Sequence, residues 1–417
     1  MRNSERRAQL NTTTENQKKN SPGLTNLLLT GATGFVGKAV LARLVGKPQY
    51  GRIYLLVRTR GNANAESRVA DVLRTVFPSD QAMALASRII PVAGDFTLPG
   101  LGLSEQDLAL LRADVHQILH CGASTDFGAP LEEARQQNTE GTRQVLNVAL
   151  NMRETGVLRR LDYVSTAFVA GIKRGLVNEN DLDRGQAFAN SYEQSKFEAE
   201  KLLAEYANRL PITIYRPSII VGDSTTGYTP HFKVLYWPVL LLARKMTSLI
   251  VCNKRAYLDV VPVDYVADGI VALMQEDSAP GQTFLLSAGL GNEIKIGELL
   301  QDANKFAGVQ HGRSLPFWLF KWMIKTPLRR MFSEQFLSVV ALASPYHSYL
   351  AGNGVRFDAS KSQEILKRLG VRNRFWKNYR EPVLRYCVDS RWGKRLPQPE
   401  HQYYMQCAHA SRDLNML

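Results

Sequence analysis

The sequence has few cysteines, and their spacing gives them no structural pattern. Among its 417 residues there are four, Cys121, Cys252, Cys387 and Cys407, with no C-x-x-C pair and no clustered histidine beside them. This spacing argues against a disulfide framework and against a zinc site. We therefore expect no metal and a reducing compartment.

The chain also lacks an apolar run long enough to cross a bilayer. Its longest apolar stretch, Val234 to Val251, is interrupted by Pro238, Arg244 and Lys245, whereas a span needs about 20 predominantly apolar residues. The first residues carry charges of both signs without the apolar core of a secretory signal. We expect a cytoplasmic protein with a disordered tail over residues 1–22.

Positive charge is in excess, and it lies mostly outside the motifs. The formal net charge is +14, and residues 311–417 hold 18 basic against 7 acidic residues. Such a surface suits nucleic acid, an anionic membrane or an acidic carrier partner, although no recognised module supports nucleic acid. The Trp-rich segment 316–325, followed by Arg329 and Arg330, indicates either peripheral membrane contact or a helix whose aromatic residues line a pocket or core.

Short apolar runs alternate with segments of helical spacing from residue 24 onward. The expected strands are Leu24–Thr30, Arg52–Val57, Ile89–Val92, Val115–His120, Arg160–Ser165, Ile212–Tyr215 and Thr283–Ser287, with helices that include Phe35–Val45, Glu132–Leu150 and Tyr192–Asn208. This alternation predicts an α/β fold with a Rossmann-type, doubly wound parallel sheet.

The pattern loosens after Gly222, which predicts a smaller, mostly helical substrate lobe. We expect a dinucleotide-binding domain over 23–222 and 255–300, a lobe over 223–254 and 301–395, and a tail over 396–417.

A glycine-rich turn joins the first expected strand to the first helix. It contains Thr30, Gly31, Thr33, Gly34, Phe35, Val36 and Gly37. Gly31 permits a tight turn, Gly34 lets the backbone approach a pyrophosphate, and Gly37 lets helix and strand pack closely. The free N–H groups at the start of the helix favour phosphate. The sequence therefore predicts a dinucleotide site.

The second expected strand ends in basic residues where NAD enzymes usually carry an acid. Arg58, Thr59 and Arg60 follow it, and a guanidinium can bind a 2′-phosphate through two charge-assisted bonds. We therefore expect NADPH rather than NADH, the alternative being that these are solvated surface arginines.

Small and polar residues follow the third and fourth expected strands. Asp95 comes after the third strand and either meets the adenine or forms a turn. Cys121, Gly122 and Ala123 come after the fourth, where small side chains either let the backbone run along the cofactor or allow tight packing.

A tyrosine and a lysine stand one helical turn apart in the helix from residue 192. Tyr192 and Lys196 share one face at this spacing, and a nearby ammonium is expected to lower the pKa of the phenol and to hold the nicotinamide ribose. Thr166 ends the preceding strand and presents a hydroxyl at the same sheet edge. The three residues are the predicted catalytic set.

The order of these motifs resembles the extended short-chain dehydrogenase/reductases, and within them the thioester reductase and fatty acyl-CoA reductase branch with its male-sterility-type NAD-binding domain. The match covers roughly 24–300 and adds Tyr54–Arg58, His120–Phe127, Asn138–Thr142, Ser165–Val169, Tyr215–Gly227 and Asp259–Val266. The segment His231–Lys233 and the basic C-terminal region depart from it.

The resemblance implies reduction of an acyl thioester by NADPH, giving an aldehyde and in some cases an alcohol. The acyl group would be carried on coenzyme A or on an acyl carrier protein. It also implies the catalytic set Thr166, Tyr192 and Lys196, and it places Asn138, Pro217 and Ser218 near the nicotinamide. A sterol or hydroxysteroid dehydrogenase, a nucleotide-sugar epimerase and a non-catalytic NADPH-binding sensor or scaffold remain alternatives.

Overall fold

A central sheet of seven parallel strands organises the chain. The computed structural model describes residues 23–59, 64–172, 175–245, 249–309, 313–352 and 354–413. The strand order is β12-β7-β5-β4-β1-β2-β3, formed by β1 (Thr25–Thr30), β2 (Tyr50–Val57), β3 (Ile89–Ala93), β4 (Gln117–His120), β5 (Arg160–Val164), β7 (Ile212–Pro217) and β12 (Thr283–Leu286). All seven strands expected from the sequence are present, and the order is that of a Rossmann-type doubly wound sheet.

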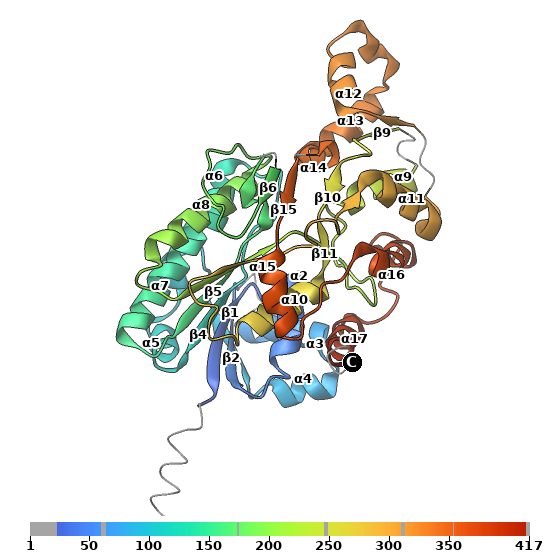
Figure 1. Cartoon of the computed structure of the whole chain (residues 1–417). Coiled ribbons are helices and arrows are strands. Elements are labelled where there is room, and N and C mark those ends of the chain that lie inside the picture. Colours follow the sequence, from blue (N-terminus) through green and yellow to red (C-terminus); the bar gives the residue numbers. More distant parts are fainter. Residues whose placement is uncertain are drawn as a thin grey trace, which may run out of the picture.

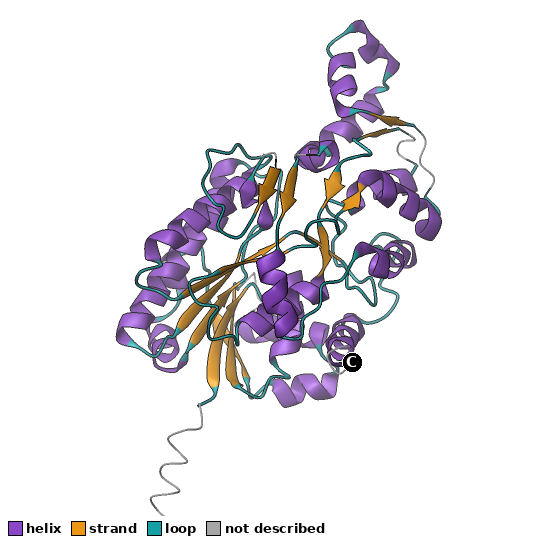
Figure 2. Cartoon of the chain, in the orientation of Figure 1, coloured by secondary structure: helices purple, strands orange, loops and turns teal. Residues whose placement is uncertain are grey.

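Helices cover both faces of this sheet (Figure 2). One face carries α2 (Phe35–Leu44), α3 (Ala65–Val76), α4 (Ser79–Leu85), α10 (Val263–Leu273), α15 (Ser360–Arg368) and α17 (Glu400–Asp413), and the other carries α5 (Glu105–Asp114), α7 (Gly141–Thr155) and α8 (Ser191–Tyr206). The strands are apolar on both sides because both faces are buried, as in other parallel sheets.

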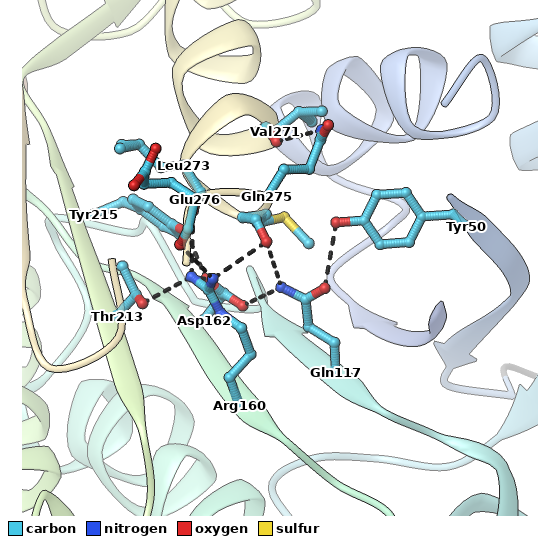
Figure 3. Close-up of polar contacts among 11 residues, drawn as sticks. Tyr50, Gln117, Arg160, Asp162, Thr213, Tyr215, Val271, Leu273, Gln275 and Glu276 are labelled. Carbon is cyan, nitrogen blue, oxygen red and sulfur yellow. Dashed lines mark hydrogen bonds and ion pairs between the residues drawn. The ribbon is translucent and has the colours of Figure 1, made fainter. Parts of the chain in front are cut away.

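Side chains from the sheet fix the C-terminal end of α10 (Figure 3). The guanidinium of Arg160 donates to the carbonyl oxygens of Met274 and Glu276 at 3.2 and 3.3 Å, and to Oδ1 of Asp162 at 2.6 Å. The hydroxyl of Tyr215 donates to the same carboxylate at 2.5 Å. Burial raises the pKa of Asp162, so its charge depends on these partners. The network holds α10 on the strands.

A second core lies beyond the carboxyl edge of the sheet and forms the helical lobe. Its elements are η3 (Ala167–Ala170), β6 (Gly175–Val177), β8 (Ile219–Val221), α9 (Tyr236–Ala243), β9 (Ile250–Val251), β10 (Tyr257–Leu258), β11 (Val260–Pro262), β13 (Ile294–Lys295), α11 (Ile296–Ala307), β14 (Ser314–Leu315), α12 (Phe317–Met323), η4 (Pro327–Met331), α13 (Glu334–Leu342), η5 (Ser344–Tyr346), α14 (His347–Ala351), β15 (Val355–Phe357) and α16 (Trp376–Asp389). In Figure 1 the lobe lies above the sheet, and α12 and α13 extend farthest from it.

The structure corrects the expected lobe and tail boundaries. The lobe was expected to resume at residue 301, but its helix α11 already begins at Ile296, and Ile296, Leu299 and Leu300 belong to the second core. Helix α15 lies inside the expected lobe segment but packs on β12 and α10 through Leu366. The segment expected as a C-terminal tail forms α17 from residue 400 to 413, whereas residues 1–22 lie outside the described part.

Helix α17 is ordered because two of its tyrosines are buried. Tyr403 stacks on Tyr228 with a centroid distance of 4.6 Å, and Tyr404 meets the same ring edge-on at 5.4 Å. Glu400 accepts a hydrogen bond from the Tyr228 hydroxyl. The helix contacts α2, α3 and α10, so it rests on the back of the dinucleotide half of the fold.

Candidate active site

The glycine turn has the geometry that its sequence predicts. Gly31 has φ +74°, and a Cβ built there would lie 2.6 Å from the amide nitrogen of Gly122. A Cβ on Gly37 would lie 2.2 Å from the carbonyl oxygen of Gly31. Neither position accepts a side chain, so the first turn of α2 packs directly against the loop.

Two connected hollows lie along the carboxyl edge of the sheet. The first, which we call the tyrosine cleft, has about 1340 Å³ of free space with its open mouth included. Among its lining residues are Gly31, Gly34, Phe35, Val36, Gly37, Cys121, Ala123, Phe127, Thr166, Phe168, Tyr192, Lys196, Pro217, Ser218 and Tyr349. The predicted catalytic set and most of the predicted cofactor residues therefore face one cavity.

The second hollow, the arginine cleft, continues from the first past the glycine turn. It is lined by Gly31, Thr33, Gly34, Leu56, Val57, Arg58, Arg68, Gly94, Phe96, Cys121, Gly122, Ala123, Ser124, Glu133 and Gln137. Four of these residues also line the tyrosine cleft. The two clefts lie at the carboxyl ends of β1 and β4, where the strand order reverses. Ligands bind at this position in doubly wound sheets.

Thr166 and Tyr192 meet inside the tyrosine cleft. Thr166 follows β5 and starts η3, where its hydroxyl oxygen accepts from the amide of Phe168 at 3.2 Å. Tyr192 lies in the first turn of α8, which is capped by the side chain of Asn190. Burial raises the pKa of Tyr192 above its usual value, and its hydrogen bond with Thr166 offsets only part of the rise. The phenol therefore stays protonated and can donate.

Lys196 lies in the same cleft, but its partners differ from those expected. Its Nζ donates to the hydroxyl of Tyr163 at 2.6 Å and to the carbonyl oxygen of Val164 at 2.8 Å. The expectation that its ammonium lowers the pKa of Tyr192 is wrong in this structure. Burial lowers the pKa of Lys196 itself to about 7, with Glu200 opposing the shift.

Two arginines line the arginine cleft. Arg58 directly follows β2 and lies 3.8 Å from Asp95, with 39% of its side chain exposed. Arg68, in the first turns of α3, donates from Nη1 to the carbonyl oxygen of Arg58 at 2.5 Å. The sequence reading missed Arg68, although a guanidinium early in the helix after this strand was a usable signal. Arg60 lies outside the described residues.

Asp95 and Thr30 have structural partners and do not line either cleft. Asp95 accepts from the amide and hydroxyl of Thr97 at 2.9 and 2.8 Å, which is the turn alternative. The next residue, Phe96, lines the arginine cleft instead. Thr30 is fully buried, and its hydroxyl lies 2.6 Å from Nδ1 of His120.

Cys121, Gly122 and Ala123 lie at the edge of a cleft, and the packing alternative holds for Gly122. All three line the arginine cleft, yet a Cβ on Gly122 would lie 2.6 Å from the ring of Phe96, so packing also requires its small size. Burial raises the pKa of the Cys121 thiol to about 12, so it stays a thiol and not a nucleophile at neutral pH.

Asn138 supports the clefts from behind. It is buried within the π-helical turn η2 (Arg135–Glu140), which follows α6 (Leu131–Ala134). Its amide donates to Oγ of Ser195 at 2.9 Å and to the carbonyl of Ser124 at 3.1 Å, and its Oδ1 accepts from the Ser124 amide at 2.8 Å. Asn138 therefore fixes the strand-end loop against α8, whereas Pro217 and Ser218 line the cleft directly.

An aromatic wall closes the tyrosine cleft on the lobe side. Phe127 stacks on Tyr192 at 5.2 Å and on Tyr349 of α14 at 6.1 Å. The Tyr349 hydroxyl donates to Oε1 of Glu193 at 2.6 Å. Phe127 was visible as part of a motif, but Tyr349 comes from a distant segment and nothing in the sequence marks it. This wall joins the lobe to the first turn of α8.

Residues 29–270 match a family model for NAD-binding domains that is described as "Male sterility protein". The chain belongs to this family. Its dinucleotide half therefore binds a nicotinamide cofactor, as the glycine turn and the two clefts indicate.

Curated relatives of the chain include a nonribosomal peptide synthetase and a fatty acyl-CoA reductase. The chain is 32% identical over 275 residues to the non-canonical nonribosomal peptide synthetase cpsA of Aspergillus campestris, covering 62% of this chain and 25% of the relative. It is 26% identical over 282 residues to the fatty acyl-CoA reductase wat of Drosophila melanogaster, covering 59% and 53%. The chain thus spans only a quarter to about half of these relatives.

A solved structure extends the likeness into the lobe. The terminal R domain from the myxalamid PKS-NRPS biosynthetic pathway superposes with a TM-score of 0.74 at 28% identity, covering 91% of this chain and 94% of that one. The fold class read from the sequence is therefore confirmed, including the region after residue 300.

Proposed function

We propose that this protein reduces acyl thioesters with NADPH, giving an aldehyde and, with a second hydride, an alcohol. The observation that carries the proposal is the tyrosine cleft. Thr166, Tyr192 and Lys196 line it together with the glycine turn. The relatives named as fatty acyl-CoA reductases support this reaction over the dehydrogenase and epimerase alternatives.

The residues present fit a nicotinamide dinucleotide phosphate. Gly31 and Gly37 leave no room for side chains between loop and helix, and the start of α2 offers N–H groups to the pyrophosphate. Arg58 and Arg68 supply positive charge in the arginine cleft for a 2′-phosphate. When bound, the cofactor supplies hydride to the thioester carbonyl carbon.

The side chains of the tyrosine cleft act on the carbonyl oxygen. The hydroxyls of Tyr192 and Thr166 donate to it, which stabilises the negative charge that develops as the carbon becomes tetrahedral. Tyr192 gives its proton to that oxygen. When the C–S bond breaks, the hydroxyl returns this proton to Tyr192, the thiolate leaves and takes a proton from solvent to become the thiol, and the aldehyde remains. No acyl-enzyme is needed.

Lys196 has a supporting role in this scheme. Its Nζ is held by Tyr163 and the Val164 carbonyl, one helical turn from Tyr192. There it can hydrogen-bond the nicotinamide ribose, and Asn138 fixes the neighbouring loop. The thiol partner is either coenzyme A or the phosphopantetheine of an acyl carrier protein.

An anaerobic NADPH-oxidation assay with a panel of acyl-CoA and carrier-bound thioesters tests the proposal. Tyr192→Phe is expected to lower turnover about 10²- to 10³-fold, because one donor to the developing oxyanion is lost. Tyr206→Phe, in the last turn of the same helix, removes a hydroxyl that bonds Asn147 and leaves turnover unchanged.

Mass spectrometry of the products separates aldehyde from alcohol. Turnover of sterols or sugar nucleotides, with no thioester reduced faster by the wild type than by Tyr192→Phe, would replace this function with one of the alternatives. Binding of NADPH without any turnover would leave a sensor or scaffold.

A further inference from the structure

A helical hairpin extends from the lobe, away from both clefts. It consists of α12, η4 and α13, spans residues 317–342, and lies at the far end of the molecule from the sheet in Figure 1. Neither the tyrosine cleft nor the arginine cleft includes any of its residues. The proposed reduction therefore gives this hairpin no role.

The hairpin has its own small aromatic core. Phe320 is 4% exposed, and its ring lies 5.4 Å from that of Phe332 and 6.1 Å from that of Phe336. Phe332 and Phe336 stack at 5.3 Å. These three rings hold the two arms together, so the remaining large apolar side chains are not needed to fold it.

Those remaining side chains point outward. Trp318 is 71% exposed and Trp322 is 55% exposed, and they stand one turn apart on one face of α12. Met331 is 70% exposed and Leu328 is 39% exposed in the adjoining η4 turn. We call these four residues the hairpin face.

Cations surround the hairpin face. Lys321, Lys325, Arg329 and Arg330 are all exposed. Between Pro316 and Ser338 the only acidic residue is Glu334, which pairs with Arg329 at 3.3 Å. The surface is therefore both apolar and positively charged.

We propose that the hairpin face docks on an anionic lipid membrane, with its indoles at the headgroup level. Tryptophan is favoured at membrane interfaces, where its apolar ring is buried and its N–H stays wet. Lysine and arginine beside it meet anionic headgroups while their stems cover apolar surface. Among the described residues we find no helix with an apolar stretch that would span a bilayer.

The size of the face favours a membrane over a protein partner. Two partly exposed indoles offer about 300 Å² of apolar area, and Met331 and Leu328 add to it, but the four side chains together stay below the roughly 800 Å² that a stable protein interface buries on each partner. A membrane interface needs only a shallow insertion of about 5–10 Å together with charge attraction.

Co-sedimentation with vesicles tests the proposal without any turnover, so its outcome is independent of the proposed function. The full chain is expected to sediment with phosphatidylglycerol–phosphatidylcholine vesicles and to stay in solution with phosphatidylcholine alone. Trp318→Ala with Trp322→Ala is expected to weaken binding about tenfold or more. Lys321→Gln with Lys325→Gln is expected to weaken it about fivefold for each cation at low salt.

Matched controls show whether the effect belongs to this face. Met83→Ala with Leu110→Ala removes two exposed apolar side chains elsewhere, and Lys377→Gln with Lys394→Gln removes two exposed cations elsewhere. Both controls should bind vesicles like the wild type. Each variant is also melted, so that loss of binding is not confused with loss of the hairpin fold.

Two results would overturn the proposal. Vesicle binding that is equal in the tryptophan variant and the wild type removes the face from membrane contact. Absent vesicle binding, combined with slower reduction by the tryptophan variant of carrier-bound thioesters only, would instead make the face a docking site for an acidic carrier protein.

Discussion

Replacing Arg58 and Arg68 together with glutamine is expected to remove the proposed preference for NADPH over NADH. Both side chains line the arginine cleft beside the glycine turn. The side chain of Arg58 is 39% exposed and forms an ion pair with Asp95, with 3.8 Å between Nη1 and Oδ2. Arg68 is half-buried and donates to the Arg58 carbonyl, so it also fixes the end of β2.

The expected magnitude follows from this partial exposure. A hydrogen bond to a charged group contributes about 1.5–3 kcal/mol, and solvent and Asp95 both screen Arg58, so the lower end applies. About 1.5 kcal/mol corresponds to roughly tenfold in kcat/KM. Because the two arginines are in contact, their effects are not additive, and the double variant should lose between about 10- and 100-fold with NADPH.

The measurement is kcat/KM for NADPH and for NADH with one thioester, together with direct binding of each dinucleotide. The variant should lose efficiency and affinity with NADPH only, since NADH lacks the 2′-phosphate. Arg74→Gln is the matched control, because it removes one charge from the same helix at an exposed position paired with Asp71. A wild type that prefers NADH, or an equal loss with both cofactors, would refute the 2′-phosphate role.

Three further changes test the fold and the buried lysine. Gly37→Ala should lower the melting temperature and weaken dinucleotide binding, because its Cβ would lie 2.2 Å from the Gly31 carbonyl oxygen; unchanged melting and binding would show that the loop can move aside. Arg160→Met should cost about 3–5 kcal/mol in urea unfolding, because Asp162 loses its buried partner, and adding Asp162→Asn should recover much of the loss; no recovery would contradict the ion-pair account. The pKa of Lys196 falls from 10.5 to about 7 on folding, so the unfolded chain binds more protons at this residue between these values, and Lys196 contributes to the free energy of unfolding a part that rises with pH from about 7 to 10.5. The raised pKa of the Cys121 thiol acts in the opposite direction above about 9, equally in wild type and variant. That rise should disappear in Lys196→Met, and an equal slope in both proteins would exclude the shift.

The sequence predicted those elements whose signals are local. Each strand of the sheet is a short apolar run that is followed by a glycine, a charged residue or a polar residue. These two local signals were sufficient to locate the strands. The glycine turn could also be predicted from the sequence. The close contacts that exclude a Cβ at Gly31 and Gly37 mostly arise within or next to one strand–turn–helix unit.

Features that depend on distant contacts could not be read in the same way. Tyr349 reaches Glu193 across 156 positions of the chain, and no local pattern marks such a pair. Helix α17 is held in place by the packing of Tyr403 and Tyr404 on Tyr228. The sequence of this segment alone suggested a polar tail.

The protonation of the candidate site was misjudged for a related reason. Helical spacing places Tyr192 and Lys196 on one face, but it does not show where the amino group points. The Nζ of Lys196 turns toward Tyr163 and the Val164 carbonyl. Burial then governs both pKa values, raising that of the phenol and lowering that of the amine.

The return of the chain from the lobe to the sheet restricts how the two parts can move. After the hairpin, α15 packs on β12 and α10, the chain crosses to the lobe again in α16, and α17 ends on α2 and α3. A lobe joined to its base by several separate crossings can move only if all of these connections bend together. Wider opening of the tyrosine cleft on this side would also have to break the hydrogen bond from Tyr349 of α14 to Glu193.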